Sequence, residues 1–190
     1  MDNALIEKVQ AFAAKAHEGQ RRKFADEPYS NHVVRVMQTC NKVSTDEVLL
    51  SAALLHDVLE DTPVPEEDMR SFLNEIFVQG DAERVIDLVK ELTDVYTPEV
   101  FPSWNRRKRK KMENDRLKDI DADAQTIKYA DIIDNSTDIA NIEYGFSAKY
   151  ISEYMSLLEV LNRGNSMLYR EAIKTVTQAQ QHIQNYVNKV

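Results

Sequence analysis

Hydrophobic residues recur three and four positions apart along most of this chain, which is the spacing of one face of an α-helix. The pattern predicts helices over residues 3–17, 32–41, 46–62, 82–93, 103–119, 122–143, 147–162 and 165–189, with another starting near residue 65. Gly19 suits the end of the first helix, and Ser44 or Thr45 suits the start of the third. Residues 19–31 and 93–102 are polar or interrupted by proline, so we expect loops there.

The composition supports an all-α fold. Only four glycines and five prolines occur in 190 residues, which is few for a protein made of many short strands. Hydrophobic residues make up 43%, enough for a sizeable core. Neither a repeat nor a linker-like segment occurs, so we expect residues 1–190 to form a single domain.

Charge and cysteine content limit the partners and the compartment. The formal charge of −8 disfavours binding to nucleic acid, because the protein as a whole repels a polyanion. The single cysteine, Cys40, follows apolar helical residues and is expected to pack in the core, as suits a reducing cytosol. The N-terminus lacks the pattern of a signal peptide, and no apolar stretch is long enough to span a membrane. We therefore expect a cytoplasmic protein without a membrane partner.

The segment Ala52–Asp61 places ionisable residues inside an apolar, helix-favouring stretch. A continuous helix would put its leucines and Val58 on one arc and the ionisable side chains on the opposite arc. These side chains are His56, Asp57, Glu60 and Asp61. The arrangement suits a metal ion with a bound water, but an acidic helix end exposed to solvent would have the same pattern. The segment alone leaves both interpretations open.

Two further segments carry residues of the same chemical type. His32 opens the second predicted helix and on its own is more typical of a capping or core histidine. Asp131 lies among apolar neighbours and shares a helix face with Lys128 and Asn135. A buried aspartate needs a partner or a metal, because burying an unpaired carboxylate is costly. Histidine and aspartate together suit Mn, Fe, Zn or Co.

The order H…HD…D of these residues resembles the HD-domain metal-dependent phosphohydrolases. Several spaced motifs narrow this resemblance to the hydrolase domain of RelA/SpoT homologues, and in plan to the single-domain small alarmone hydrolases. The motifs are Ala16–Lys23, Pro28-Tyr29-x-x-His32, Ala52–Thr62 and Lys128-x-Ala130-Asp131-x-x-x-Asn135. The resemblance covers about residues 8–140, with C-terminal helices at about 147–189, and implies an HD-domain helical bundle.

The resemblance also implies a reaction and a ligand set. These enzymes remove the 3′-pyrophosphate of ppGpp and pppGpp, giving GDP or GTP and pyrophosphate, with Mn²⁺ or another divalent transition metal. The implied metal ligands are His32, His56, Asp57 and Asp131. Glu60 and Asp61 match the acidic pair that positions or deprotonates the attacking water, a role that suits carboxylates one turn from a metal.

Basic residues and Asn135 are the implied contacts for the nucleotide. Arg22 and Lys23 match the family's basic pair, and Lys128 and Asn135 belong to the fourth motif. His17 fits the first motif without an assigned role. The cations of residues 106–111 are expected near the polyphosphate, although pairing with nearby acids would explain most of them equally well.

Some features leave the substrate and the partners open. Ile132 stands where the family commonly has arginine after the ligand aspartate. The alternatives are a phosphohydrolase acting on another nucleotide, such as a nucleoside monophosphate or an NADPH-like dinucleotide, and a catalytically silent nucleotide-binding module. The apolar stripe of residues 169–190 is expected to pack on the domain, with a homo-oligomer contact as the alternative.

Overall fold

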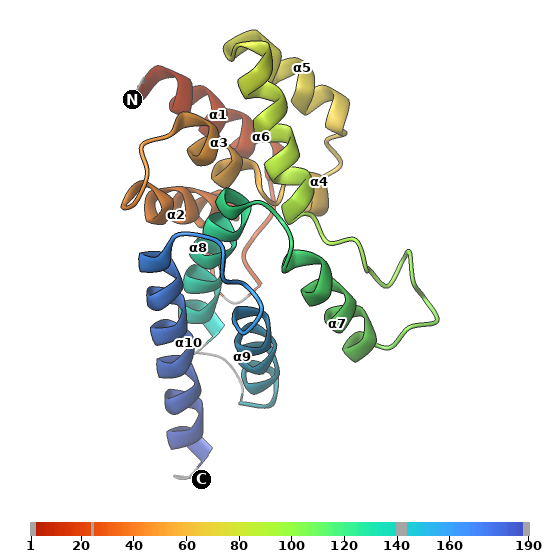
Figure 1. Ribbon diagram of the computed structural model, residues 1–190, viewed down its shortest axis with the longest axis vertical. Helices are drawn as coiled ribbons and strands as arrows, with labels where there is room; N and C mark the ends of the chain where they lie inside the picture. The colour runs from red at the N-terminus through yellow and green to blue at the C-terminus, as the bar shows by residue number, and fades with distance from the viewer. Residues whose placement is uncertain (1–2, 24, 140–143, 188–190) are drawn as a thin grey trace. The chain divides into compact units, whose positions relative to one another are not determined.

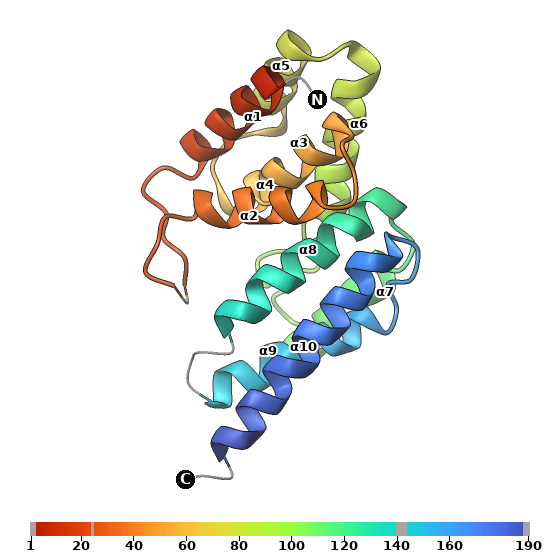
Figure 2. The ribbon, with the colours of Figure 1, turned by 90° about the vertical axis from the view of Figure 1, so that its left-hand side faces the viewer.

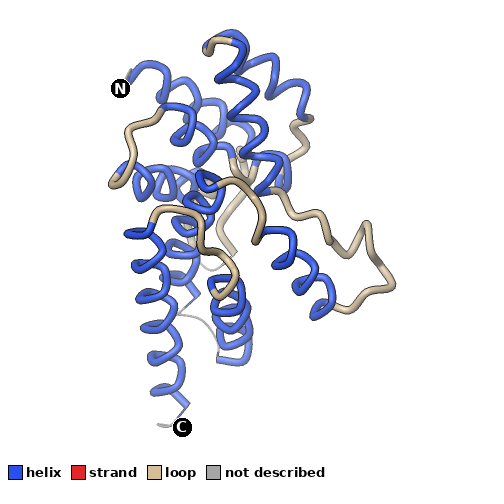
Figure 3. Tube along the Cα trace, in the orientation of Figure 1, coloured by secondary structure: helices blue, strands red, loops and turns tan. Residues whose placement is uncertain are grey.

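The structure is a computed structural model that describes residues 3–23, 25–139 and 144–187 (Figure 1). The described residues form α-helices joined by loops, with one isolated antiparallel bridge between Arg21 and Pro28 and no strand (Figure 3). The all-α prediction is therefore confirmed. The chain divides into two compact units, Met1–Thr93 and Asp94–Val190. The assignment of residues 1–190 to a single domain stays a prediction.

The first unit is built around its third helix. Its helices are α1 (Asn3–Ala16), α2 (Ser30–Asn41), α3 (Glu47–Leu55), α4 (Val58–Asp61), α5 (Glu66–Ile76) and α6 (Gln79–Leu92). Every residue from Leu49 to Leu55 is buried, because α1, α2 and α6 all pack against α3. Cys40 is fully buried in α2, as predicted, and burial raises the pKa of its thiol to about 12.

The segment predicted as one helix over residues 46–62 is interrupted, so that prediction is wrong. Helix α3 ends at Leu55, and α4 begins at Val58. Asp57 has φ −98° and ψ −2°, at the edge of the helical region. The helical hydrogen bonds resume immediately afterwards, from Asp61 N to Asp57 O at 2.8 Å. His56 and Asp57 thus occupy the junction between two helices.

The start of α3 also differs from the prediction. Asp46 is the N-cap, and its carboxylate accepts a 3.0 Å hydrogen bond from Val48 N. The Ser44 hydroxyl accepts a hydrogen bond from Asp46 N instead, so neither Ser44 nor Thr45 caps the helix. Gly19 has φ +79°, a conformation that glycine adopts readily, and it follows α1 as predicted.

The second unit packs two of its helices against α10, and its first helix contacts α9. Its helices are α7 (Arg106–Leu117), α8 (Ala122–Ile139), α9 (Tyr144–Leu158) and α10 (Ser166–Val187). Helices α8 and α9 both pack against α10, which Figure 2 shows running beside them. Ala172, Val176, Ala179 and Ile183 of the predicted apolar stripe are buried, so this part of the stripe packs within the unit as expected. Side chains 186–190 of the stripe lie outside the described residues. None of the helices in the described ranges is both long and apolar enough to cross a membrane.

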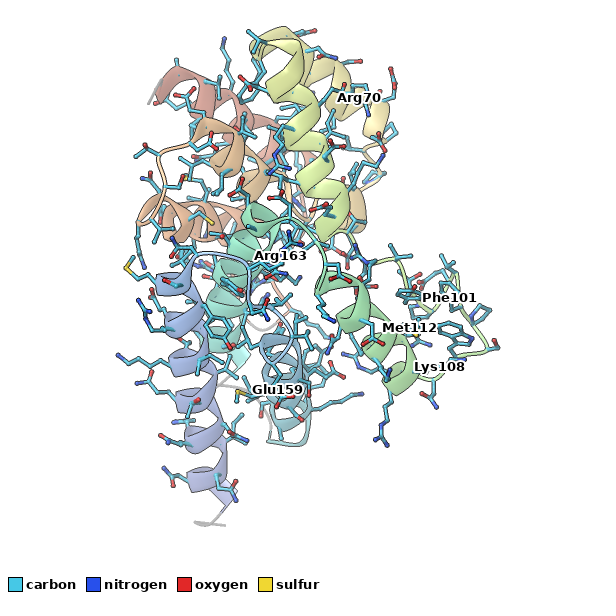
Figure 4. The ribbon with its side chains drawn as sticks, in the orientation of Figure 1. Arg70, Phe101, Lys108, Met112, Glu159 and Arg163 are labelled. Atoms are coloured by element: carbon cyan, nitrogen blue, oxygen red, sulfur yellow. The ribbon has the colours of Figure 1, made fainter. Side chains whose placement is uncertain are left out.

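The loop before α7 is held by a buried carboxylate. Glu113 accepts hydrogen bonds from the backbone N–H groups of Val95 at 3.1 Å and Tyr96 at 3.0 Å. The loop carries an aromatic cluster, in which Phe101 lies 4.6 Å from Trp104 between ring centroids. Lys108, labelled in Figure 4 with Phe101, lies with its Nζ 3.8 Å from the centre of the Trp104 ring.

Candidate metal centre

Three side chains from the first unit bring metal-ligating atoms together. His32 on α2, and His56 and Asp57 at the junction of α3 and α4, offer atoms that all lie within 4.8 Å of one another. Asp57 Oδ2 lies 3.0 Å from His56 Nε2 and 3.5 Å from His32 Nε2. Both histidines are buried, whereas the Asp57 side chain keeps 16% of its surface exposed. The carboxylate is therefore the edge of the cluster that solvent can reach.

The protonation of His56 explains why this cluster suits a cation. Its Nδ1 lies 2.9 Å from the backbone carbonyl of Ala53, which can only accept a hydrogen bond, so Nδ1 carries the proton. In the neutral ring, Nε2 then presents its lone pair towards Asp57 Oδ2. Two lone pairs at 3.0 Å repel unless a positive charge lies near both. Two imidazole nitrogens and a carboxylate suit a divalent transition metal in that place.

The acidic pair Glu60 and Asp61 follows on α4. Asp61 Oδ2 lies 2.9 Å from the Tyr29 hydroxyl, and its backbone carbonyl accepts a 2.5 Å hydrogen bond from Gln20 Nε2. Partial removal from water raises the pKa of Asp61, and the neighbouring Asp57 raises it further. Glu60 is exposed. Asp61 is therefore tied to the candidate ligand Asp57 through Tyr29.

Tyr29 is the residue that the sequence analysis missed. Its hydroxyl donates to Asp57 Oδ2 at 2.7 Å, and its ring meets the ring of His32 edge-on at 5.5 Å. Burial and the two neighbouring carboxylates raise the pKa of Tyr29, so the hydroxyl keeps its proton at neutral pH. The only signal in the sequence was the position of Tyr29 inside the motif that ends at His32.

His17, for which the sequence offered no role, lies behind Tyr29. The two rings stack with centroids 4.7 Å apart. His17 Nδ1 lies 2.8 Å from Gln20 Oε1, and because the same amide donates through Nε2 to Asp61 O, its oxygen must accept from His17. His17 is almost fully buried. It supports the wall of the site and is not a member of the three-residue cluster.

The candidate substrate residues Arg22 and Lys23 lie in the loop between α1 and α2. Arg22 is buried, and its Cζ lies 5.7 Å from the centre of the Tyr29 ring. The backbone bridge between Arg21 and Pro28 closes this loop on itself. Lys23 is exposed. The structure thus places Arg22 against the aromatic ring beside the cluster.

The remaining site candidates belong to the second unit. Asp131 on α8 is buried, and Lys128 Nζ lies 3.0 Å from Asp131 Oδ2. Asn135 Nδ2 donates to Asp131 Oδ1 at 2.5 Å. The predicted shared face of these three residues is therefore confirmed. The role of Asp131 as a fourth metal ligand stays a prediction.

Most cations of residues 106–111 pair with groups of their own unit. Arg106 binds both oxygens of Glu153, at 2.8 and 2.7 Å. Lys110 lies 3.1 Å from Asp94, and Lys111 lies 3.0 Å from Asp115. Arg109 donates to the carbonyl of Trp104. The pair of Lys111 with Asp115 matches the alternative left open by the sequence, whereas Arg106 and Lys110 pair with acids farther away along the chain.

Comparison with known proteins assigns the chain to a class. A family model described as HD domain matches residues 10–153, and the chain belongs to the HD-domain family. Within that family it is similar to the guanosine-3′,5′-bis(diphosphate) 3′-pyrophosphohydrolase MESH1 of Drosophila melanogaster, with 34% identity over 75% of this chain and 74% of the relative. MESH1 of Xenopus tropicalis is 30% identical over 86% of each chain.

A solved structure gives the same result for the fold. The structure of a metazoan orthologue of SpoT that hydrolyses ppGpp superposes with a TM-score of 0.78. It is 28% identical and covers 94% of this chain and 97% of its own. The resemblance to HD-domain hydrolases of the RelA/SpoT type, first drawn from spaced motifs, is confirmed.

Proposed function

We propose that this protein is a metal-dependent hydrolase that removes the 3′-pyrophosphate from ppGpp and pppGpp. The observation that carries the proposal is the His32, His56 and Asp57 cluster with Asp61 beside it, in a chain similar to named ppGpp 3′-pyrophosphohydrolases. Water would form a bond to phosphorus while the bond to the 3′ oxygen breaks. The sugar 3′ oxygen then takes a proton, and the products are GDP or GTP and pyrophosphate.

The ligand set consists of His32, His56 and Asp57, completed by Asp131. A divalent metal bound there, with Mn²⁺ as our choice, would lower the pKa of a bound water and stabilise negative charge on the phosphoryl oxygens. The proposal for Asp131 rests on its place in the family motif and on its burial among apolar residues of α8. Lys128 lies 3.0 Å from Asp131. If the Asp131 carboxylate bound a metal ion, Lys128 would become available to bind phosphate.

The acidic pair would handle the attacking water. The raised pKa of Asp61 brings its protonation equilibrium closer to neutrality, which is where a group that accepts and returns a proton works best. Glu60 is exposed on α4 and can reach water directly. Arg22 and Lys23 would bind the base and the phosphates, and Asn135 the sugar or base. Arginine suits this task because it pairs with phosphate and stacks on a purine.

Product analysis tests the proposal. The Mn²⁺-loaded protein is incubated with ppGpp, pppGpp, NADPH and nucleoside monophosphates, and pyrophosphate and orthophosphate are measured separately. We expect pyrophosphate from the first two nucleotides. If only NADPH or a monophosphate is hydrolysed, and the product is orthophosphate, the substrate is another nucleotide and not ppGpp. A difference in substrate would fit the buried Ile132, which stands beside Asp131 where the family commonly has arginine. Binding of ppGpp without turnover would identify a silent module.

Two variants separate binding of the metal from chemistry. Glu60→Gln should lose turnover and keep the metal, whereas Asp57→Asn should lose both. Glu159→Gln, which changes an exposed glutamate labelled in Figure 4, is the matched control and should keep full activity. Full activity in Glu60→Gln would contradict the role of the acidic pair. We place this reaction in the cytoplasm, because a free cysteine such as the buried Cys40 suits a reducing compartment.

A further inference from the structure

The hydroxyl of Tyr29 joins two acidic groups to which we assign different tasks. It lies 2.7 Å from Oδ2 of the proposed ligand Asp57 and 2.9 Å from Oδ2 of Asp61. A phenol has one proton to donate, so the two carboxylates share one donor. The distance between these two like-charged groups is therefore set by Tyr29 as well as by the short helix α4.

The ring of Tyr29 has contacts of its own. One neighbour is His32, a proposed ligand, at 5.5 Å and edge-on. Another is Arg22, a proposed substrate contact, with its Cζ 5.7 Å from the ring centre. His17 stacks on the ring at 4.7 Å and is held in turn by Gln20. The side chain of Tyr29 thus contacts a proposed metal ligand, a proposed water-activating residue and a proposed substrate-binding residue.

We propose that Tyr29 is a positioning residue. Its hydroxyl holds the metal-ligating carboxylate and the water-activating carboxylate at a fixed distance from each other, and its ring orients Arg22. The inference rests on the proposed function for the roles of its neighbours. The hydroxyl acts on Asp57 and Asp61, and the ring acts on Arg22. These two actions can be separated by substitution.

Tyr29→Phe removes the hydroxyl and keeps the ring. Partners of metal ligands commonly change metal affinity or activity by about 10–100-fold when they are lost. We expect a loss of this size in Mn²⁺ affinity together with a lower kcat, and KM within about twofold of the wild type, because the face of phenylalanine also attracts arginine. Tyr29→Leu removes the ring as well, and should raise KM in addition.

Tyr169→Phe is the matched control. Its hydroxyl donates to the backbone carbonyl of Leu158 at 3.2 Å, within the second unit. The same atom is removed, so a general effect of losing a tyrosine hydroxyl would appear in both variants. We expect kcat, KM and Mn²⁺ affinity of Tyr169→Phe to equal those of the wild type.

The measurements are steady-state hydrolysis of ppGpp and competition for Mn²⁺ against a chromophoric chelator. Equal kcat and Mn²⁺ affinity in wild type and Tyr29→Phe would overturn the inference, as would equal losses in Tyr29→Phe and Tyr169→Phe. If the wild type does not turn over ppGpp, the proposed function fails. The Mn²⁺ competition still decides the inference in that case, because it needs no substrate.

Discussion

Removing divalent cations should lower the melting temperature of this protein, because three of the proposed ligands already face one another. Asp57 Oδ2 lies 3.0 Å from His56 Nε2 and 3.5 Å from His32 Nε2. Without a cation, a neutral His56 directs its Nε2 lone pair at the Asp57 carboxylate, and the two repel. A bound cation turns this repulsion into attraction, and the native state alone holds the three atoms together.

The size of the effect follows from mass action. A ligand present at 100 times its dissociation constant stabilises the native state by about 2.7 kcal/mol. In a chain of 190 residues, each kcal/mol corresponds to roughly 2–4 °C in melting temperature. We therefore expect the chelated protein to melt about 5–11 °C below the protein saturated with Mn²⁺.

The assay is thermal unfolding followed by circular dichroism, after chelation and after stepwise addition of Mn²⁺, Co²⁺, Zn²⁺ or Mg²⁺. Asp57→Asn is the key comparison, since its amide can donate to His56 Nε2 across the same 3.0 Å gap. The metal-free variant should be at least as stable as the metal-free wild type, and should not respond to metal. An equal metal response in Asp57→Asn, or no response of the wild type to any of these ions, would refute the reasoning.

Other regions allow further predictions. Gly164→Ala should lower the free energy of unfolding by about 1–3 kcal/mol, because the new Cβ would lie 2.6 Å from Tyr129 Cε2. Unfolding in urea measures this loss. Cys40, whose pKa burial raises from 9.0 to about 12, should be alkylated about three orders of magnitude more slowly at pH 8.5 than in the unfolded chain. The protonated thiol favours the fold below pH 9, and this contribution is lost as the pH rises through 12. Glu113→Ala should free the loop before α7 and shift the fluorescence of Trp104, the only tryptophan; an unchanged spectrum would show that the carboxylate does not hold the loop.

Helical periodicity and residue type carried much of the prediction. The apolar spacing indicated the helices, and the family resemblance pointed to His32, His56 and Asp57, three residues that the structure brings together from two segments. Cys40 was predicted to be buried because it ends an apolar face, and it is. These successes share a cause, since each rests on local pattern or on the chemistry of a side chain.

The failures concern contacts between distant residues and local backbone conformation. Tyr29 binds carboxylates 28 and 32 positions away, and no periodicity marks it. Arg106 pairs with Glu153, 47 positions away, so the basic run looked more available to ligands than it is. The end of α3 depends on one backbone angle at Asp57, which helix propensity does not reveal.

The junction at His56 and Asp57 affects how this site can be dissected by mutation. Alanine has the highest helix propensity of all residues, and α3 and α4 lie directly on either side of the junction. An alanine at position 57 would remove a charge and also favour joining the two helices into one, which would swing the side chains of α4 about the helix axis. Loss of activity in such a variant would mix two causes. Asparagine keeps the shape of aspartate and is a poorer helix former than alanine, so it removes the charge without favouring one continuous helix.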